Sequence, residues 1–170
     1  MLIPLNKLKE KYNINPKGAM HIGSSTGQEC EEYYKCGIKS TVWVEAIPEV
    51  FNKLQKHISD YPNTLAINAC IADLDDLEVE FNVSSNEGES SSILEFGTHA
   101  EVHPDVTFID KIKMKTKTLY TLISENNINL LELDLLNCDL QGAELLALKG
   151  LGERIIFIKY IYLEVNEKEL

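Results

Sequence analysis

The sequence predicts an α/β fold built on a doubly wound, mostly parallel sheet. Three observations predict it: apolar strand segments alternate with amphipathic helical segments, each crossover is long enough to join parallel strands, and a glycine-bearing turn follows the first strand. The chain has 170 residues, 44% hydrophobic and 25% charged, which is typical of one globular domain. We therefore expect residues 1–170 to form a single domain.

The chain opens with a short amphipathic helix and a strand. Leu5, Leu8 and Tyr12 stand at the i, i+3, i+7 spacing of an apolar helix face. We expect residues 1–16 to form a helix that caps one face of the domain. The segment Gly18–Gly23 then predicts a short buried strand.

A helix, a strand and a second helix are expected next. Thr26 and Glu29 have the spacing of a capping box, which predicts a helix that begins at Thr26 and ends at Gly37. Thr41–Ala46 is rich in β-branched and aromatic residues, as strands are. Pro48 then occupies a first-turn position before an apolar helical stripe. Strand and helix therefore alternate through this part of the chain.

The middle of the chain interrupts the alternation. A third strand is expected at Leu65–Ile71, and two more at Leu77–Val83 and Val106–Lys115, where apolar and polar residues alternate. A serine-rich stretch lies between the last two. We expect residues 84–105 to form a mobile insertion, either a flexible linker or a lid whose hydroxyls contact a ligand.

The alternation resumes in the C-terminal third. Thr118 should cap a short helix. Leu131–Leu136 and Tyr160–Val165 are expected strands, and Gly142–Leu148 is the expected helix between them.

Charge and hydropathy disfavour two classes of partner. The chain has 16 Lys and Arg against 27 Asp and Glu, a formal charge of −11, and no basic run. General attraction to nucleic acid or to an anionic membrane is therefore disfavoured. The apolar stretches are much shorter than the ~20 residues of a membrane span, and the N-terminal segment lacks a signal-peptide core. We expect a cytoplasmic protein.

Cysteine and histidine spacing predicts neither disulfides nor a metal site. The four cysteines form no C-x-x-C pair and each lies in or beside an apolar segment, so buried free thiols are expected. They are Cys30, Cys36, Cys70 and Cys138. His99 and His103 have a spacing that could share a metal on a helix. Pro104 follows at once, however, so we expect a loop there and no metal.

Two features favour an adenosine-type ligand. The turn at His21–Gly27 opens a helix, where glycine lets backbone approach a ligand and amide N–H groups can hold an anion. Its spacing is not G-x-G-x-x-G, which disfavours a dinucleotide. Glu45 ends the second strand, 22 residues after Gly23, where a carboxylate can accept two hydrogen bonds from a ribose diol. The alternatives are an ordinary structural turn and a solvated strand-end carboxylate.

Three stretches of the sequence resemble the FkbM-type methyltransferases. They are the D-x-Q-G-A-E stretch Asp139–Glu144, the E-V-N stretch Glu164–Asn166, and the G-x-x-x-G turn Gly23–Gly27 followed by Gln-Glu, with a serine cluster between. The resemblance runs from about Gly18 to Leu170, and D-x-Q-G-A-E is its most specific part. It implies an S-adenosylmethionine-dependent enzyme, in most cases an O-methyltransferase, on a Rossmann-like sheet of the class I methyltransferase type.

The resemblance has two further implications for the fold and the cofactor site. Sheets of this type continue with a helix and an antiparallel strand pair, so we expect that C-terminal pair to be missing, in either a shortened version or a fragment. In the cofactor site, Glu45 would contact the ribose, Asn68–Cys70 the adenine edge and Asp139 the sulfonium side. The full implied set is His21, Gly23, Ser24, Ser25, Gly27, Glu29, Glu45, Ala46, Asn68, Ala69, Cys70, Ser92 and Asp139.

Methyl transfer from a sulfonium requires alignment of the reactants and exclusion of water more than it requires a protein nucleophile. A general base would help an alcohol acceptor to react. Asp139, His103 and Glu164 are the candidates, because each is expected near a strand's carboxyl end or on the insertion. Asp139 could instead hold the donor's amino group or a water molecule, so the choice of base stays open.

Two hypotheses from different classes follow. The first is an O-methyltransferase whose acceptor is a hydroxyl of a sugar, glycan or other small metabolite. The alternative is a non-catalytic protein that keeps the cofactor fold and acts by binding, for example as a homodimer through an open sheet edge. A nicotinamide-dependent oxidoreductase is disfavoured by the missing third glycine and by the D-x-Q-G-A-E stretch.

Overall fold

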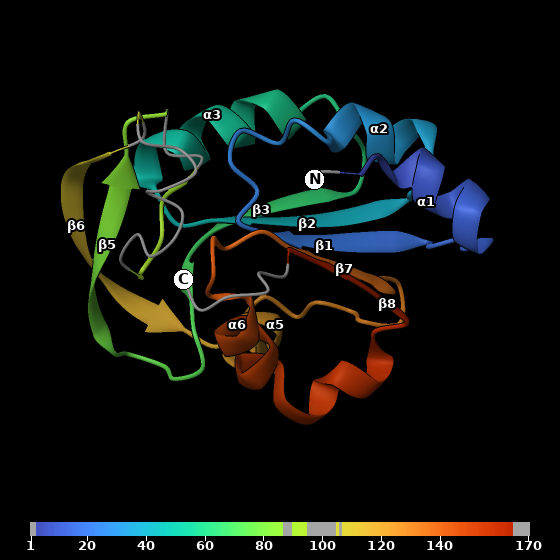
Figure 1. Ribbon diagram of the computed structural model, residues 1–170. Helices are drawn as coiled ribbons and strands as arrows, with labels where there is room; N and C mark the ends of the chain where they lie inside the picture. Colours follow the sequence, from blue (N-terminus) through green and yellow to red (C-terminus); the bar gives the residue numbers. More distant parts are fainter. Residues whose placement is uncertain (1–2, 87–89, 95–104, 106, 165–170) are drawn as a thin grey trace.

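The computed structural model describes residues 3–86, 90–94, 105 and 107–164 (Figure 1). In chain order its elements are α1 Leu5–Tyr12, β1 Gly18–Ile22, α2 Cys30–Lys35, β2 Ser40–Glu45, α3 Pro48–Ile58, β3 Thr64–Asn68, β4 Cys70–Ile71, β5 Glu78–Ser84, β6 Phe108–Lys117, α5 Leu119–Glu125, β7 Leu135–Cys138, α6 Glu144–Leu151, the 3-10 helix η1 Gly152–Phe157 and β8 Tyr160–Leu163.

The main sheet has five parallel strands in the order β3-β2-β1-β7-β8. Figure 1 shows α1, α2 and α3 over one face and α5 and α6 over the other. The predicted doubly wound, mostly parallel α/β fold is therefore confirmed. The strand order reverses beside β1, and ligands of such sheets bind at the carboxyl ends of the strands near that point.

Side chains alternate between the two faces of the sheet, and both faces are buried. Met20 and Ile22 of β1 pack toward α5 and α6 with Val44 of β2. Ala19 and Trp43 pack on the opposite face in a cluster that also holds Leu5 of α1. Burial on both faces is what a parallel sheet with helices on each side requires.

A second, three-stranded sheet has the order β4-β6-β5, with β4 parallel to β6 and β5 antiparallel to it. The prediction of a single strand at Leu65–Ile71 is wrong, because these residues belong to two strands, β3 in the main sheet and β4 in the second sheet. The side-chain amide of Asn68 donates to the backbone oxygens of Glu45 and Ala46 at the end of β3. Cys70 and Ile71 then pair with β6 instead of β2.

Two predicted boundaries are also wrong. The second helix begins at Cys30, not at Thr26, because residues 24–30 form successive tight turns and no side chain caps the helix start. The Glu29 carboxylate lies 3.9 Å from Nδ1 of the buried His21 ring. The strand predicted at Leu131–Leu136 begins only at Leu135, and Leu131 is 74% exposed in the turn before it.

The prediction that Thr118 caps a helix is confirmed, since its hydroxyl accepts the Thr121 N–H at the start of α5. Each helix within the described ranges is too short or too polar to cross a lipid bilayer. β8 forms one edge of the main sheet as far as the chain is described.

Candidate functional site

A pocket lies at the carboxyl ends of β1, β2 and β7, where the second sheet meets the main one. It encloses about 540 Å³ of empty space, its open mouth included. Strand ends and the turns after them supply Ile22, Gly23, Ser25, Val44, Glu45, Ala46, Asp139, Leu140 and Ala143. The region from Ala69 to Ile93 supplies Ala69, Cys70, Ile71, Phe81, Ser91 and Ile93.

Gly23 lets the turns after β1 and β7 touch. Its φ is +75°, and a Cβ placed on it would lie 1.8 Å from the backbone oxygen of Asp139. Gly27 has a different role, because a Cβ there would meet Leu54 of α3 at 2.8 Å. The first glycine therefore shapes the pocket, and the second allows the turn to pack on a helix.

The amides of this turn are already used within the protein. Gly23 and Ser24 donate to the Val44 carbonyl at 2.9 and 3.1 Å, and Gly27 donates to Ser24 at 2.9 Å. Ser25 donates to Glu45. The expectation that this turn offers its N–H groups to an anionic ligand is therefore wrong at these four positions.

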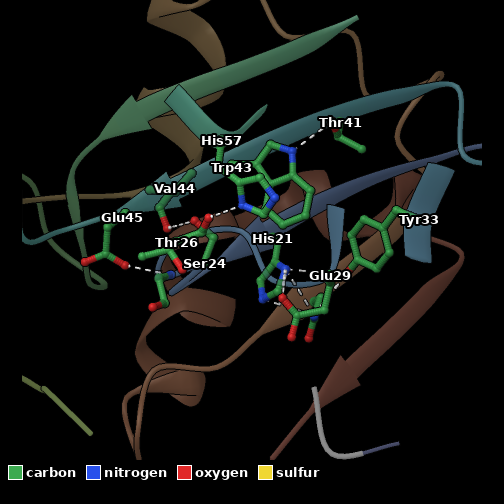
Figure 2. Close-up of polar contacts among 12 residues, drawn as sticks. His21, Ser24, Thr26, Glu29, Tyr33, Thr41, Trp43, Val44, Glu45 and His57 are labelled. Carbon is green, nitrogen blue, oxygen red and sulfur yellow. Dashed lines mark hydrogen bonds and ion pairs between the residues drawn. The ribbon is translucent and has the colours of Figure 1, made fainter. Parts of the chain in front are cut away.

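Glu45 is held rigidly at the pocket wall. Its side chain is 7% exposed, and its two oxygens accept the backbone N–H groups of Ser25 at 2.9 Å and Ile47 at 2.8 Å. Figure 2 shows the Glu45 carboxylate directed at the turn that holds Ser25. Burial raises the pKa of Glu45 to about 7, against the opposing effect of these backbone hydrogen bonds. Each carboxylate oxygen can accept two hydrogen bonds, so Glu45 keeps acceptor capacity for a ligand beside its backbone partners.

Stability should depend on pH through Glu45. Unfolded, this carboxyl loses its proton near pH 4.5, whereas folded it keeps the proton until about pH 7. The folded state thus binds more protons in this window, and stability falls as pH rises through it. We expect the Glu45 contribution to be about 3 kcal/mol, measured by urea denaturation at pH 5 and pH 8.

The comparison of variants isolates this effect. Burial lowers the pKa of His21 to about 4, and its contribution has the opposite sign, so stability rises with pH as His21 loses its proton in the unfolded chain. The readout is therefore the difference in pH-dependent stability between the wild type and Glu45→Gln, because the glutamine amide does not titrate between pH 5 and pH 8. Exposed Glu49 of α3 provides the control variant Glu49→Gln. An unchanged pH dependence in Glu45→Gln would contradict the assignment.

The D-x-Q-G-A-E stretch forms the turn between β7 and α6. Asp139 lines the pocket and accepts the side-chain amide of Gln141 at 2.6 Å. The Glu144 carboxylate accepts the backbone N–H groups of Leu140 at 2.7 Å and of Gly142. Glu144 is thus a buried cap that fixes the turn presenting Asp139. Sequence reasoning missed this role, although an acidic residue in a helix's first turn is its usual signal.

The end of the serine stretch packs against the site. Ser90, Ser91 and Ser92 are each less than 9% exposed. Ser92 exchanges backbone hydrogen bonds with Asn82 of β5, and its hydroxyl donates to the Leu140 carbonyl at 3.2 Å. These three serines are therefore fixed and do not behave as a flexible linker. The remaining residues of the insertion include ranges outside those described.

Sequence reasoning also missed the pocket wall that this region supplies. Phe81, Ser91 and Ile93 line the pocket, and Ser91 lies there in place of the predicted Ser92. No sequence signal connected β5 to the turn after β1, because their approach depends on the second sheet.

His21 belongs to a buried cluster on the other face of the sheet. Its ring centroid lies 5.2 Å from that of Trp43 and 6.0 Å from that of Tyr33, and its Nε2 lies 3.2 Å from Asn137 Nδ2. Figure 2 shows His21, Tyr33 and Glu29 together, away from Glu45. The structure does not bring His21 or Glu29 to the pocket wall.

Several other predicted residues support the site without lining it. Ser24 is buried and its hydroxyl donates to the Val44 carbonyl at 3.1 Å. Asn68 anchors the turn after β2 through its two amide hydrogen bonds. Cys70 does line the pocket, and burial raises the pKa of its thiol to about 12, so it is protonated at neutral pH. All four cysteines are free thiols.

The three candidate general bases lie in different places relative to the pocket. Asp139 lies on the pocket wall. Glu164 follows β8 outside the pocket lining, and burial together with the carboxylates of Asp139 and Glu144 raises its pKa. His103 lies outside the described residues, as does His99.

Comparison with known proteins found a matching family and a similar solved structure. Residues 19–169 match the family described as methyltransferase FkbM domain. A search of curated proteins found no match. The fold is similar to the crystal structure of methyltransferase FkbM from Methylobacillus flagellatus KT, with a TM-score of 0.55 and 12% identity, over 88% of this chain and 32% of that one. The chain therefore spans about a third of the length of that protein.

Proposed function

Because the chain belongs to the FkbM methyltransferase family, we propose that it is an S-adenosylmethionine-dependent O-methyltransferase acting on a hydroxyl of a sugar, glycan or other small metabolite. The observation that carries the proposal is the buried Glu45 carboxylate at the end of β2, facing a pocket between the turns after β1 and β7.

The residues present fit an adenosine-bearing donor. Glu45 keeps acceptor capacity beside its backbone hydrogen bonds, which suits a ribose hydroxyl. Phe81, Ile71 and Ile93 give the pocket an apolar wall, which suits a planar base. Asp139 stands on the wall formed by the β7 turn.

When bound, the donor supplies a methyl group activated by its sulfonium, so the chain has to align an acceptor hydroxyl and accept its proton. Asp139 is the described wall carboxylate other than Glu45, and it is the first choice of base. Gln141 orients it through the 2.6 Å hydrogen bond. Glu164 is the second choice, and His103 stays a prediction.

Calorimetry followed by a transfer assay tests the proposal. We expect S-adenosylmethionine and S-adenosylhomocysteine to bind and NAD not to bind. With radiolabelled methyl donor, label should appear in at least one acceptor from a panel of sugars, glycans and small alcohols. The proposal fails if neither sulfur compound binds.

A second candidate function is favoured by the exposed sheet edge. In the part of the chain described, β8 pairs only with β7, Ile161 of β8 is 43% exposed, and Ile156 of η1 just before it is 77% exposed. An open, apolar edge suits association with a second copy. Donor binding without transfer to any acceptor, together with a dimer in sedimentation, would favour this non-catalytic role.

The proposal includes a cytoplasmic location. Its support is the absence of disulfides among the four cysteines, which are all free thiols, as expected in a reducing compartment.

A further inference from the structure

The described pocket wall carries two carboxyl groups and no cationic side chain. Its ionisable carboxyls are Glu45 and Asp139, and none of its described residues is Lys, Arg or His. Six backbone amides of the wall are already paired within the protein. Those of Gly23, Ala69, Asp139 and Ala143 donate to backbone oxygens, and those of Ser25 and Leu140 donate to carboxylates.

More carboxyl groups lie on the β7 side of the pocket. Asp139 lies near two further carboxyls, Glu144 in the same turn and Glu164 after β8. The pKa of Glu164 is raised by burial and by the charges of Asp139 and Glu144, while the N-terminal ammonium acts in the opposite direction. The Gln141 amide that Asp139 accepts is uncharged.

We propose that this pocket selects its ligand by charge: it prefers the positively charged S-adenosylmethionine over the uncharged thioether product, and it rejects adenine nucleotides that carry phosphate. The inference rests on the proposed function. The donor carries a sulfonium, an ammonium and a carboxylate, a net charge of about +1, and transfer of the methyl group leaves a product of net charge about zero.

The physical basis is Coulomb attraction across a partly buried site. A unit charge a few ångströms from a carboxylate, with screening typical of a protein surface, changes a binding constant by about tenfold or more. The charge that holds the donor disappears with the methyl group. The product should therefore leave readily and inhibit weakly.

Calorimetry at low ionic strength with three ligands tests the charge preference. They are S-adenosylmethionine, S-adenosylhomocysteine, and sinefungin, in which an amine-bearing carbon replaces the sulfonium and keeps the positive charge. We expect the two charged ligands to bind about tenfold more tightly than the homocysteine compound. Added salt should reduce this ratio. Adenosine should bind and AMP should not.

Two variants locate the effect. Asp139→Asn should reduce the preference to about twofold. Glu164 lies outside the pocket lining, so Glu164→Gln should reduce the preference by less. Glu31→Gln removes one charge from exposed α2, so it changes the net charge equally and should leave the preference intact. Circular dichroism checks that each variant is folded.

The outcomes are distinguishable. Equal or tighter binding of the homocysteine compound overturns the charge selection and leaves the methyltransferase proposal standing. If Glu31→Gln reduced the preference as much as Asp139→Asn did, the preference would depend on net charge, and its assignment to the pocket carboxylate would be overturned. No binding of any of the three ligands overturns the proposed function and this inference with it.

Discussion

Replacing Glu45 with glutamine is expected to weaken binding of S-adenosylhomocysteine by about 100-fold. The carboxylate accepts Ser25 N–H and Ile47 N–H on its two oxygens and keeps further acceptor capacity. Glutamine has one oxygen and one NH₂ group, so the NH₂ would face an N–H donor and could not accept a ribose hydroxyl. The loss of a charge-assisted hydrogen bond and the disturbed turn together correspond to about 3 kcal/mol.

Calorimetry at pH 8, where Glu45 is ionised in the folded protein, measures this loss. The matched control is Glu49→Gln, the same change at an exposed position of α3, which should bind as the wild type does. Retention of wild-type affinity by a folded Glu45→Gln protein would remove Glu45 from the binding site. The fold would stand, but the observation that carries the proposed function would be lost.

Replacing Gly23 with alanine is expected to destabilise the protein by more than about 4 kcal/mol. The new Cβ would lie 1.8 Å from the Asp139 backbone oxygen, and the backbone φ of +75° is strained for any other residue. The turns after β1 and β7 would have to separate. Their separation would also break the hydrogen bond from Asp139 N–H to Ile22 and open the pocket.

Gly37→Ala is the matched control for this prediction. Gly37 has a similar φ of +83°, but a Cβ there meets nothing within 4 Å, so it should cost only about 1 kcal/mol of backbone strain. Urea denaturation of both variants separates the clash from the strain. Equal stability of the two would show that the turns can separate at little cost.

The strand–turn–helix units of the main sheet could be predicted because their signals are local. Pro48 and the apolar stripe after it define α3, and Glu45 ends β2 where the sequence predicts. Parallel strands place their carboxyl ends at one edge, so the approach of Glu45 to the Gly23 turn followed from the fold class alone.

The sequence did not distinguish residues that line the pocket from residues that only support its walls. Side chains of a strand alternate between faces, so Ile22 and Val44 face the pocket while His21 and Trp43 pack on the opposite side. The sequence shows this alternation, but it does not show which face the second sheet covers. That choice depends on β5 and the serine stretch.

The sequence by itself determined the fold class, the family, and the positions of Glu45, Gly23 and Asp139 at the carboxyl ends of their strands. The tertiary structure decided how the pocket is closed, since the chain leaves the main sheet after β3 and β4 pairs with β6 at Thr116, while Phe81 and Ser91 line the site. It also decided that the turn's amides are already paired. Both outcomes depend on contacts between segments far apart in the chain, and local propensity and periodicity carry no information about those partners.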